Sequence, residues 1–281
     1  MSRIFSESWN DYELLDAGNN KKLERWGTVV TIRPERNAYF RPALSDTEWK
    51  KTAHFEFIEK TSNSGEWKVL QKNVPHEWQI SFGEIKLNLK LTKFKHVGIF
   101  PEQRINWDFV SDHLKSGDRF LNLFGYTGAV SVVARKKGAD VFHCDSVKQI
   151  IQWGKENMEA SNLSDIHWVL EDALKFAHRE VKRGNKFKGI IMDPPAFGLG
   201  ANKERWKIEN KFEELISLAK ELIEPNGFII ANTYSPRLEQ KEIMSLTRKV
   251  FPVSDISCNK LCIRSKSRKI IEYGELTRVL T

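Results

Sequence analysis

The sequence predicts an α/β fold in which a doubly wound, mostly parallel sheet follows a small antiparallel β region. From about residue 106 onward, apolar runs of strand length alternate with segments of helical period, a pattern typical of parallel sheets covered by helices. Two of these runs end abruptly in loops rich in glycine or proline, at residues 125–128 and 193–198. Before residue 94, short β-rich runs are separated by turn signals and show little helical period.

The amino-terminal region is predicted to be a small β domain that covers residues 1–94. Its six candidate strands are short runs separated by turn signals and lie at residues 13–15, 28–32, 54–58, 67–70, 78–82 and 85–91. Many of the nine tryptophans fall in this first third of the chain, namely Trp9, Trp26, Trp49, Trp67 and Trp78. Large aromatic side chains on a sheet favour core or interdomain packing over base stacking. The role predicted for the domain is recognition of the substrate.

The rest of the chain, residues 95–281, is predicted to form the α/β domain. Its candidate strands lie at residues 119–123, 139–144, 166–170, 187–192 and 228–231, and its candidate helices at residues 106–114, 129–137, 147–160, 173–182, 206–223 and 239–250. The helix at 206–223 is predicted from apolar positions at three and four spacing. A long hairpin, residues 253–263 and 269–279, closes the chain.

The loop after the first strand of this domain carries the first indication of a ligand. It reads Gly125-Tyr126-Thr127-Gly128. Glycines there allow the backbone to approach a bound molecule, and the amides at a helix start attract a carboxylate or phosphate. Asp145 ends the second strand, where a carboxylate accepts hydrogen bonds from ribose hydroxyls. Two glycines do not make the dinucleotide fingerprint, so S-adenosylmethionine (SAM) is the predicted cofactor, with plain strand-turn-helix packing as the alternative.

A second indication follows the fourth strand, which ends in Asp193-Pro194-Pro195. Two prolines exclude a helix and supply no backbone donors, so they hold the chain extended with carbonyl oxygens available to a substrate. Open α/β sheets bind ligands at this edge. Asp193 and Pro194 are therefore candidate catalytic residues, and a proline-rich turn with an incidental aspartate is the alternative.

These motifs occur in the order that class I SAM-dependent methyltransferases have them. Residues 121–128, Asp145, Asp172 and residues 193–195 resemble the motif series of that family, and more narrowly of the bacterial 23S ribosomal RNA large-subunit methyltransferases and their uncharacterised relatives. Residues 98–104 are similar to a segment that reads Gly-x-Phe-x-Asp-Gln-Arg in that group, with Glu102 where aspartate is usual. The resemblance covers about residues 95–281.

The resemblance implies a Rossmann-like domain of seven strands with an antiparallel end. It implies that Phe100 covers the cofactor, that Gln103 or Arg104 makes a polar contact near its methionine end, and that Asp172 accepts from the adenine amine. Capping of the next helix is the alternative reading of Asp172. The implied cofactor site comprises Phe100, Gln103, Asn122, Phe124, Gly125, Tyr126, Thr127, Gly128, Asp145, Asp172 and Asp193.

The residue after the fifth strand bears on the acceptor atom. In the ribosomal RNA relatives that methylate carbon 5 of cytosine, a cysteine nucleophile stands there, whereas this chain has Tyr234. The three cysteines are interpreted as buried structural thiols, and no metal site is expected. A ring or exocyclic nitrogen is the predicted acceptor. Asp193 and the Pro194 carbonyl would orient it, and Phe197 or Tyr234 would stack on the flipped base.

Charge points to a polyanionic partner. The chain has 45 Lys and Arg against 37 Asp and Glu, a formal charge of +8 and a pI near 9.2, which favours nucleic acid. Basic residues interleave with aromatics over residues 21–41 and cluster again at residues 264–269; both segments could contact RNA, and a solvated basic surface is the alternative. No membrane span or signal pattern is recognised. Few cysteines fit a reducing compartment, so a cytoplasmic location is predicted, while the oligomeric state stays open.

Other functions remain open at this point. The acceptor could be a protein or a small molecule, because a fold does not fix its substrate. The chain could also be a non-catalytic RNA-binding protein on a methyltransferase scaffold. A nicotinamide oxidoreductase would need the Gly-x-Gly-x-x-Gly loop that is absent from the sequence. The leading prediction is SAM-dependent methylation of RNA, ribosomal RNA first, at a base nitrogen.

Overall fold

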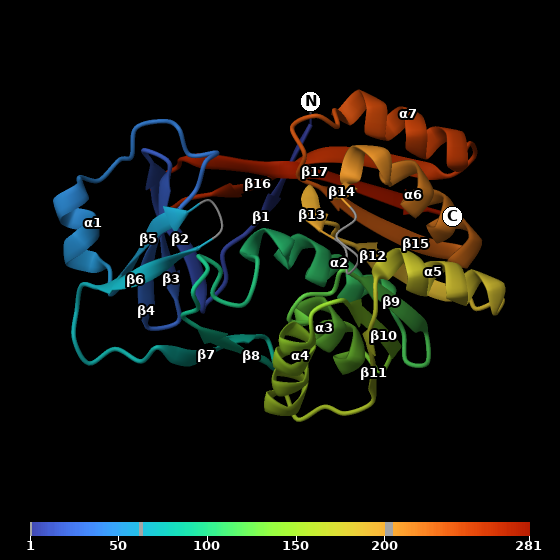
Figure 1. Cartoon of the computed structure of the whole chain (residues 1–281), viewed down its shortest axis with the longest axis horizontal. Helices are drawn as coiled ribbons and strands as arrows, with labels where there is room; N and C mark the ends of the chain where they lie inside the picture. Colours follow the sequence, from blue (N-terminus) through green and yellow to red (C-terminus); the bar gives the residue numbers. More distant parts are fainter. Residues whose placement is uncertain (1, 62–63, 200–204) are drawn as a thin grey trace. The chain divides into compact units, whose positions relative to one another are not determined.

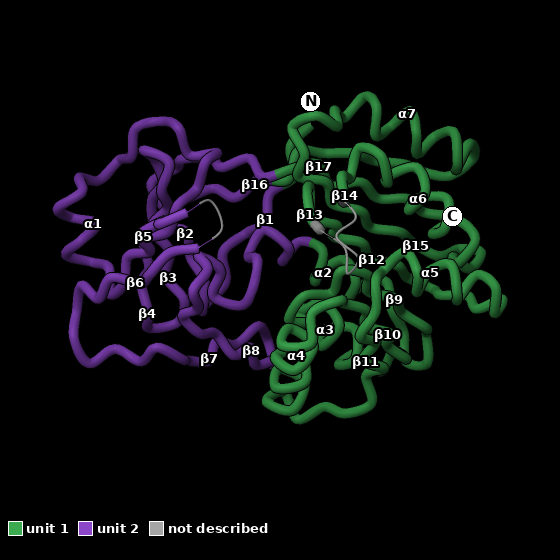
Figure 2. Tube along the Cα trace, in the orientation of Figure 1, with its two compact units in different colours: residues 1–4, 106–261, 274–281 green, residues 5–105, 262–273 purple. Residues whose placement is uncertain are grey.

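The chain is divided into two compact units. The computed structural model describes residues 2–61, 64–199 and 205–281. Unit 1 contains Met1–Ile4, Asn106–Leu261 and Gly274–Thr281, and unit 2 contains Phe5–Ile105 and Cys262–Tyr273 (Figure 2). The predicted domain boundary at residues 94 and 95 falls before the Ile105–Asn106 junction. The turn of the closing hairpin belongs to unit 2 because the two hairpin strands are long and continue from one unit into the other.

Unit 1 is built on a large mixed sheet with the order β1-β16-β17-β15-β12-β9-β10-β11 (Figure 1). β15, β12, β9, β10 and β11 pair in parallel, and β17 pairs antiparallel with β15. The predicted seven-stranded arrangement is confirmed, and a short edge strand that was not predicted, β1, extends it. The strands are β1 (Arg3–Ser6), β9 (Arg119–Leu123), β10 (Asp140–Asp145), β11 (Ile166–Leu170), β12 (Phe187–Met192), β15 (Ile223–Thr233), β16 (Asp255–Arg264) and β17 (Ile270–Leu280).

Helices connect these strands and pack in two groups. α3 packs beside α4, while α5, α6 and α7 pack against one another in succession. The helices are α2 (Arg104–His113), α3 (Ala129–Lys136), α4 (Lys148–Ala160), α5 (Ala173–Lys182), α6 (Phe212–Leu222) and α7 (Gln240–Val250). No helix in the described part of the chain is long and apolar enough to cross a membrane.

β9 illustrates how the sequence separates the two faces of the sheet. Successive side chains of a strand point to opposite faces. Leu121 and Leu123 belong to the core cluster that the strands form with α5, α6 and α7. Asn122, between them, lies on the opposite face and donates to Ser131 of α3. Every one of these four residues is nearly fully buried, which is the expected environment of a central parallel strand.

Unit 2 contains a five-stranded sheet with the order β2-β3-β4-β5-β6 and a separate β7–β8 hairpin. Neighbouring strands of the larger sheet are antiparallel except for the parallel pair β4–β5. The elements are β2 (Tyr12–Gly18), β3 (Lys21–Trp26), β4 (Val29–Pro34), α1 (Asp46–Thr52), β5 (Phe55–Thr61), β6 (Ser64–Val69), β7 (Glu77–Phe82), β8 (Ile85–Lys90) and the 3-10 turn η1 (Pro101–Gln103). The predicted small β region is therefore confirmed.

The strand β3 and the helix α1 were not predicted from the sequence. β3 reads Lys-Lys-Leu-Glu-Arg-Trp, a composition typical of a surface, yet Glu24 is fully buried. The guanidinium of Arg33 donates to both Glu24 oxygens at 2.7 and 2.9 Å, and the hydroxyl of Tyr12 donates at 3.0 Å. These contacts compensate the desolvation of the carboxylate, so a charged segment forms an interior strand.

The predicted helix at residues 206–223 is wrong over its first part. β13 (Phe197–Leu199) and β14 (Arg205–Lys207) pair antiparallel, the 3-10 turn η2 (Ile208–Asn210) follows, and α6 begins only at Phe212. The indole of Trp206 donates to the carbonyl oxygen of Pro195 at 2.6 Å. That bond holds Trp206 beside the segment after β12. Trp206 therefore does not belong to the apolar face of the helix that begins at Phe212.

Candidate active site

The carboxyl ends of four parallel strands are joined by backbone hydrogen bonds. The Gly125 amide donates to Cys144 O at 3.0 Å, and the Glu171 amide donates to Asp145 O at 3.1 Å. The Asp193 amide lies 3.4 Å from Leu123 O. The loops after β9, β10, β11 and β12 therefore meet at one edge of the sheet in unit 1, where open α/β sheets bind ligands.

Gly125 is required by a buried histidine. A Cβ on Gly125 would contact Cε1 of His143 and would lie 2.6 Å from its Nδ1 and 2.8 Å from its Nε2. Gly128 has φ +77°, and a Cβ there would lie 3.2 Å from the Trp168 ring. Close approach of the backbone to a ligand stays a prediction for these glycines; the structure shows that their Cβ positions face His143 and Trp168. The sequence did not predict the packing of these two rings against the loop, because His143 and Trp168 each lie in an apolar run that indicates only a strand.

The loop is held in an uncommon backbone conformation. Phe124 and Tyr126 have φ of +59° and +50°, in the left-handed region that side chains other than glycine rarely adopt. The Gly128 amide donates to Gly125 O at 3.0 Å, and Asn157 of α4 donates to Thr127 O at 2.9 Å. Such over-determined strain is concentrated at functional sites.

Asn122 lies in a buried polar chain beneath the loop. Its Nδ2 donates to Ser131 Oγ at 2.8 Å, and Ser131 Oγ lies 2.9 Å from His143 Nδ1. Burial lowers the pKa of His143 to about 3, so its imidazole is neutral at physiological pH. The cofactor contact of Asn122 stays a prediction; the structure shows that its side-chain nitrogen donates to Ser131 of α3.

Asp145 organises the loop with both carboxylate oxygens. Oδ2 accepts from the Tyr126 amide at 3.0 Å, and Oδ1 accepts from the Val147 amide at 2.9 Å. Burial raises the pKa of Asp145 above its ordinary value, against the lowering effect of these amides. Each carboxylate oxygen has a further lone pair, so the residue fits additional donors such as ribose hydroxyls.

Asp172 caps the helix after β11. Its Oδ1 accepts from the Lys175 amide at 3.0 Å, at the start of α5, so the capping alternative is correct. The cap uses only one of the two carboxylate oxygens. The neighbouring Glu171 pairs with Arg179. Burial raises the pKa of Cys144, as do the charges of Asp145, Glu171 and Asp172, which places these acids around the end of β10.

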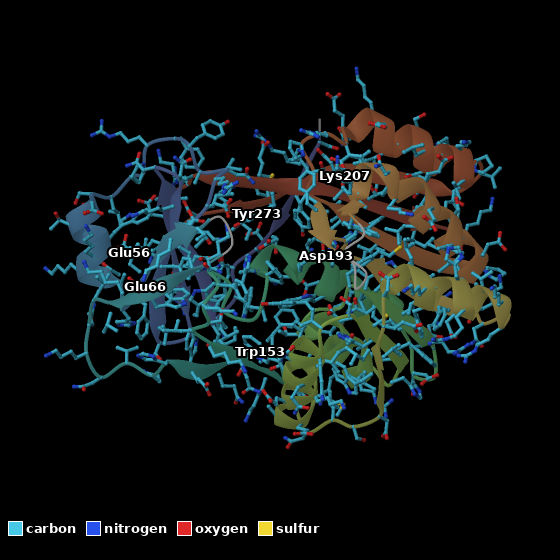
Figure 3. All side chains as sticks on the ribbon, viewed as in Figure 1. Glu56, Glu66, Trp153, Asp193, Lys207 and Tyr273 are labelled. Atoms are coloured by element: carbon cyan, nitrogen blue, oxygen red, sulfur yellow. The ribbon has the colours of Figure 1, made fainter. Side chains whose placement is uncertain are left out.

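The segment after β12 is fixed by aromatic side chains. The Trp206 indole donates to Pro195 O, which uses one of the two lone pairs of that carbonyl oxygen. The ring of Phe124 lies 5.4 Å from the Trp206 ring and packs on the core of unit 1. Asp193 follows directly at the end of β12 (Figure 3). The proline segment is thus attached to the loop that follows β9.

The residues after β15 include Tyr234, which is partly buried. A Cβ on Gly274 of β17 would lie 2.9 Å from the Tyr234 ring, so glycine is needed there.

Burial raises the pKa of Cys258 as well as that of Cys144. All three cysteines of the chain lie in its described part as buried free thiols, Cys144, Cys258 and Cys262. Neutral buried thiols are poor nucleophiles.

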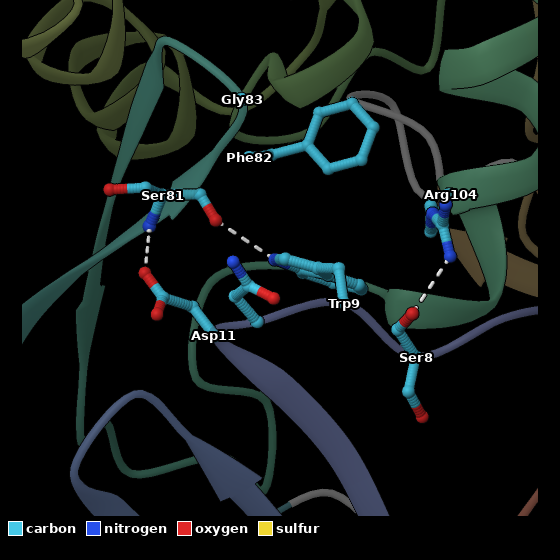
Figure 4. A pocket seen from close by; sticks show the side chains of 8 residues that line it. Ser8, Trp9, Asp11, Ser81, Phe82, Gly83 and Arg104 are labelled. Atoms are coloured by element: carbon cyan, nitrogen blue, oxygen red, sulfur yellow. Dashed lines mark hydrogen bonds between the residues drawn. The ribbon is translucent and has the colours of Figure 1, made fainter.

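The predicted cofactor residues Phe100 and Gln103 belong to unit 2, and their role stays a prediction. The neighbouring Arg104 donates from Nη1 to Ser8 O at 2.9 Å. It lines a cavity of about 590 Å³ in unit 2 with Trp9 and Phe82, whose ring centroids are 5.8 Å apart (Figure 4). Among the described residues, no group of three or more His, Cys, Asp or Glu side chains could hold a metal ion.

The residues at the sheet edge fit the parts of SAM. α3 begins after Gly128 with no capping side chain among the described residues, so the first-turn amides are suited to a carboxylate. Asp145 can accept from a ribose, and Asp172 keeps an acceptor oxygen outside its cap.

Known proteins are similar to this chain in sequence and in structure. The ribosomal RNA large subunit methyltransferase K/L of Shewanella frigidimarina is 30% identical over 182 residues, which are 63% of this chain and 25% of that protein. The enzyme of the same name from Pseudoalteromonas atlantica is 27% identical over 80% of this chain and 34% of its own length. The chain thus spans between a quarter and about a third of these relatives.

A SAM-dependent methyltransferase from Agrobacterium tumefaciens has a very similar structure, with a TM-score of 0.90, 29% identity and coverage of 100% of this chain and 96% of that one. The family model of the S-adenosylmethionine-dependent methyltransferases matches residues 50–256 of this chain. The match includes the strand ends, the glycine loop and the Asp-Pro-Pro segment described above, and the chain therefore belongs to the family of S-adenosylmethionine-dependent methyltransferases.

Proposed function

We propose that this protein transfers a methyl group from SAM to a nitrogen of a base in RNA, with ribosomal RNA as the first candidate. The ribosomal RNA methyltransferase relatives and the formal charge of +8 support an RNA acceptor. The cytoplasmic location predicted from the sequence stays a prediction, as does the role of unit 2 in substrate recognition.

In this proposal the sheet edge of unit 1 holds the cofactor. Asp145 accepts from the ribose hydroxyls, Asp172 accepts from the adenine amine, and the start of α3 after Gly128 binds the carboxylate. Bound SAM supplies an already activated methyl group on its sulfonium. The protein therefore has to position the acceptor and to exclude water.

The segment after β12 is the observation on which the acceptor assignment depends. Its two prolines exclude a helix, and the Trp206 indole fixes it through a hydrogen bond to Pro195 O. Asp193 and the Pro194 carbonyl then accept from the N–H of the acceptor and direct its lone pair toward the methyl group. Tyr234 or Phe197 stacks on the base; Phe197 is 54% exposed, which suits a residue that receives a ligand.

Cysteine chemistry is disfavoured by the environment of the thiols. Methylation of carbon 5 of cytosine needs a thiolate that adds to the ring. The thiols are all buried, and the pKa of Cys144 and of Cys258 is raised by burial first. A thiol in such surroundings stays protonated, so a nitrogen acceptor is the better assignment.

The test replaces Asp193 by asparagine and measures single-turnover transfer of a tritiated methyl group to the total RNA, protein and small-molecule fractions of a deletion strain, followed by nucleoside analysis of the RNA. Asp193→Asn should lower the rate by about 100-fold or more, the scale of a lost orienting group, with SAM affinity measured by calorimetry as the cofactor control. Asp165→Asn removes a carboxylate that is 76% exposed and should leave the rate unchanged. Wild-type rates in Asp193→Asn with normal RNA binding would refute the role. Label in protein or in small molecules instead of RNA would refute the acceptor.

A further inference from the structure

Two basic segments that are far apart in the sequence are attached to the same edge strand of unit 2. β2 is one edge of the five-stranded sheet. The first segment is the loop of residues 35–44 that follows β4. The second is the turn of residues 264–269 that joins β16 to β17. The loop overlaps the basic stretch of residues 21–41, the turn is the basic cluster of residues 264–269, and the contacts of β2 bring the two together.

The loop of residues 35–44 is fixed at its backbone to the β2–β3 turn. The Asn19 amide donates to Phe40 O and the Asn20 amide donates to Ala38 O, both at 2.8 Å. Pro42 packs so closely on Gly18 that a Cβ there would lie 2.6 Å from its Cδ. Tyr39 lies between these anchor points with 82% of its surface exposed. A large aromatic ring is thus presented to solvent from a fixed backbone.

The β16–β17 turn is bound to β2 itself. The Lys266 amide donates to Leu14 O at 2.8 Å, and the Ser267 amide donates to Leu15 O at 3.2 Å. The hydroxyl of Ser267 donates to Asp16 Oδ1 at 2.5 Å. The side chains of Lys266 and Arg268 are exposed, so this turn presents two cations from a fixed backbone.

Asp16 links the two segments. Oδ1 lies 3.3 Å from the Ala43 amide, and Oδ2 accepts from the Leu44 amide at 2.8 Å. Ser267 of the turn and the Trp49 indole donate to the same carboxylate. Burial raises the pKa of Asp16, but these hydrogen bonds outweigh it and hold the pKa below its ordinary value. The negative charge of the Asp16 carboxylate is therefore satisfied by hydrogen bonds within unit 2.

The neighbouring acids are engaged locally as well. Asp46 pairs with Lys50 at 2.6 Å, and Glu48 accepts from the backbone and hydroxyl of Ser45 in the capping box of α1. The five cations of the two segments are exposed, and the guanidinium of one of them, Arg264, lies over the Phe5 ring, 4.7 Å from its centroid. The five are Arg36, Arg41, Arg264, Lys266 and Arg268.

We propose that Tyr39 and these five cations form a binding surface for a single-stranded segment of the RNA substrate. The inference rests on the proposed function and assigns to unit 2 a specific contact with that substrate. An unpaired base stacks on the exposed Tyr39 ring, and the cations bind the phosphates on either side of it. Little ordering is needed on binding because both segments are fixed beforehand. A duplex binds more weakly because its bases are already stacked.

The test measures binding of a short fluorescein-labelled single-stranded RNA by anisotropy. Tyr39→Ala should weaken binding about 30-fold, the middle of the range for loss of one base–aromatic stack, while Tyr39→Trp should keep it. Both variants should retain the wild-type denaturation midpoint, since Tyr39 lies outside the core. The labelled duplex of the same sequence should bind more weakly than the single strand.

Salt dependence separates specific phosphate contacts from general charge. Lys266→Gln with Arg268→Gln should reduce the slope of log K against log salt by about 1.4, since each phosphate contact to a single strand contributes about 0.7. The matched control is Lys68→Gln with Lys72→Gln. It removes the same charge from exposed lysines in and after β6, the opposite edge of the sheet, and should lower the slope far less.

Equal effects of the two double variants, or unchanged binding in Tyr39→Ala, would overturn the proposal. Failure of the proposed function has a different result. In that case SAM binds and no methyl group reaches RNA in the wild-type protein, whatever the binding surface does. If the surface alone is wrong, the wild-type protein methylates RNA, and the Tyr39 and Lys266 variants bind and methylate it as well as the wild type.

Discussion

Gly125→Ala distinguishes the structural reason for the glycine loop from the reason that the sequence suggests. The backbone of Gly125 is outside the left-handed region, so alanine adds a methyl group without strain in φ. That methyl would lie 2.6 Å from Nδ1 of His143, about 1 Å inside the usual contact distance of about 3.5 Å. His143 is fully buried and bonded to Ser131, so it cannot easily move.

The expected cost follows from overpacking a buried site. Gly125→Ala should lower the free energy of unfolding by about 1 to 3 kcal/mol. Because the loop moves with the methyl group, the Kd for SAM should rise about tenfold, which corresponds to about 1.4 kcal/mol. Urea denaturation and titration calorimetry measure the two quantities.

A second substitution identifies the cause. If His143 is the reason for the glycine, then Gly125→Ala with His143→Ala should be more stable than the sum of the two single changes by about 1 to 3 kcal/mol, and it should recover most of the SAM affinity. If the glycine were needed for approach of the ligand, the double variant would still bind SAM poorly. Wild-type stability and affinity in Gly125→Ala would refute both explanations.

The remaining predictions concern three carboxylates. Asp145→Ala removes the acceptor for the Tyr126 amide and should raise the Kd for SAM more than tenfold in calorimetry. Asp172→Ala should cost about 1 kcal/mol of stability through the lost cap, and Asp172→Asn, which can still cap α5, much less. Glu102 is 4% exposed, and burial raises its pKa from 4.5 to about 7. Because the folded state holds this proton more tightly, wild-type stability falls as pH rises from about 4.5 to about 7, and the advantage of Glu102→Gln should grow across that window by about 3 kcal/mol.

Three results would contradict these predictions. Unchanged SAM affinity in Asp145→Ala would remove the ribose contact from the proposal. Equal stability of the two Asp172 variants would mean that the cap contributes nothing. A stability difference between Glu102→Gln and the wild type that is independent of pH would show that the carboxyl has the same pKa in the folded and the unfolded state.

The alternation of strands and helices in unit 1 was predictable because its apolar runs have clear periods. From β9 to α5 the predicted segments coincide closely with the observed ones. Charge content misled the prediction for β3, since the pairing of Glu24 with Arg33 depends on β4 and cannot be recognised in a local pattern. The predicted helix wrongly included Trp206 for a similar reason. The hydrogen-bond partner of Trp206 is Pro195 O, which lies in a separate segment and cannot be recognised from the local pattern.

At the site, the positions of the functional segments were predictable and several of their contacts were not. The edge that carries Asp145, Asp172 and Asp193 follows from where three apolar runs end. The fit of His143 against Gly125 depends on the register of β10 beside β9, which one strand alone does not reveal. Asn122 was assigned to the cofactor because the loop looks like a ligand site, and its partner Ser131 becomes apparent only when α3 is in place.

A crystal of the protein grown with S-adenosylhomocysteine tests the central claim most directly. We expect the product at the carboxyl edge of the sheet in unit 1, with its ribose hydroxyls within hydrogen-bond distance of Asp145 and its carboxylate at the start of α3. Density for the compound at another place, or side chains closing residues 125–128 against it, would contradict the account.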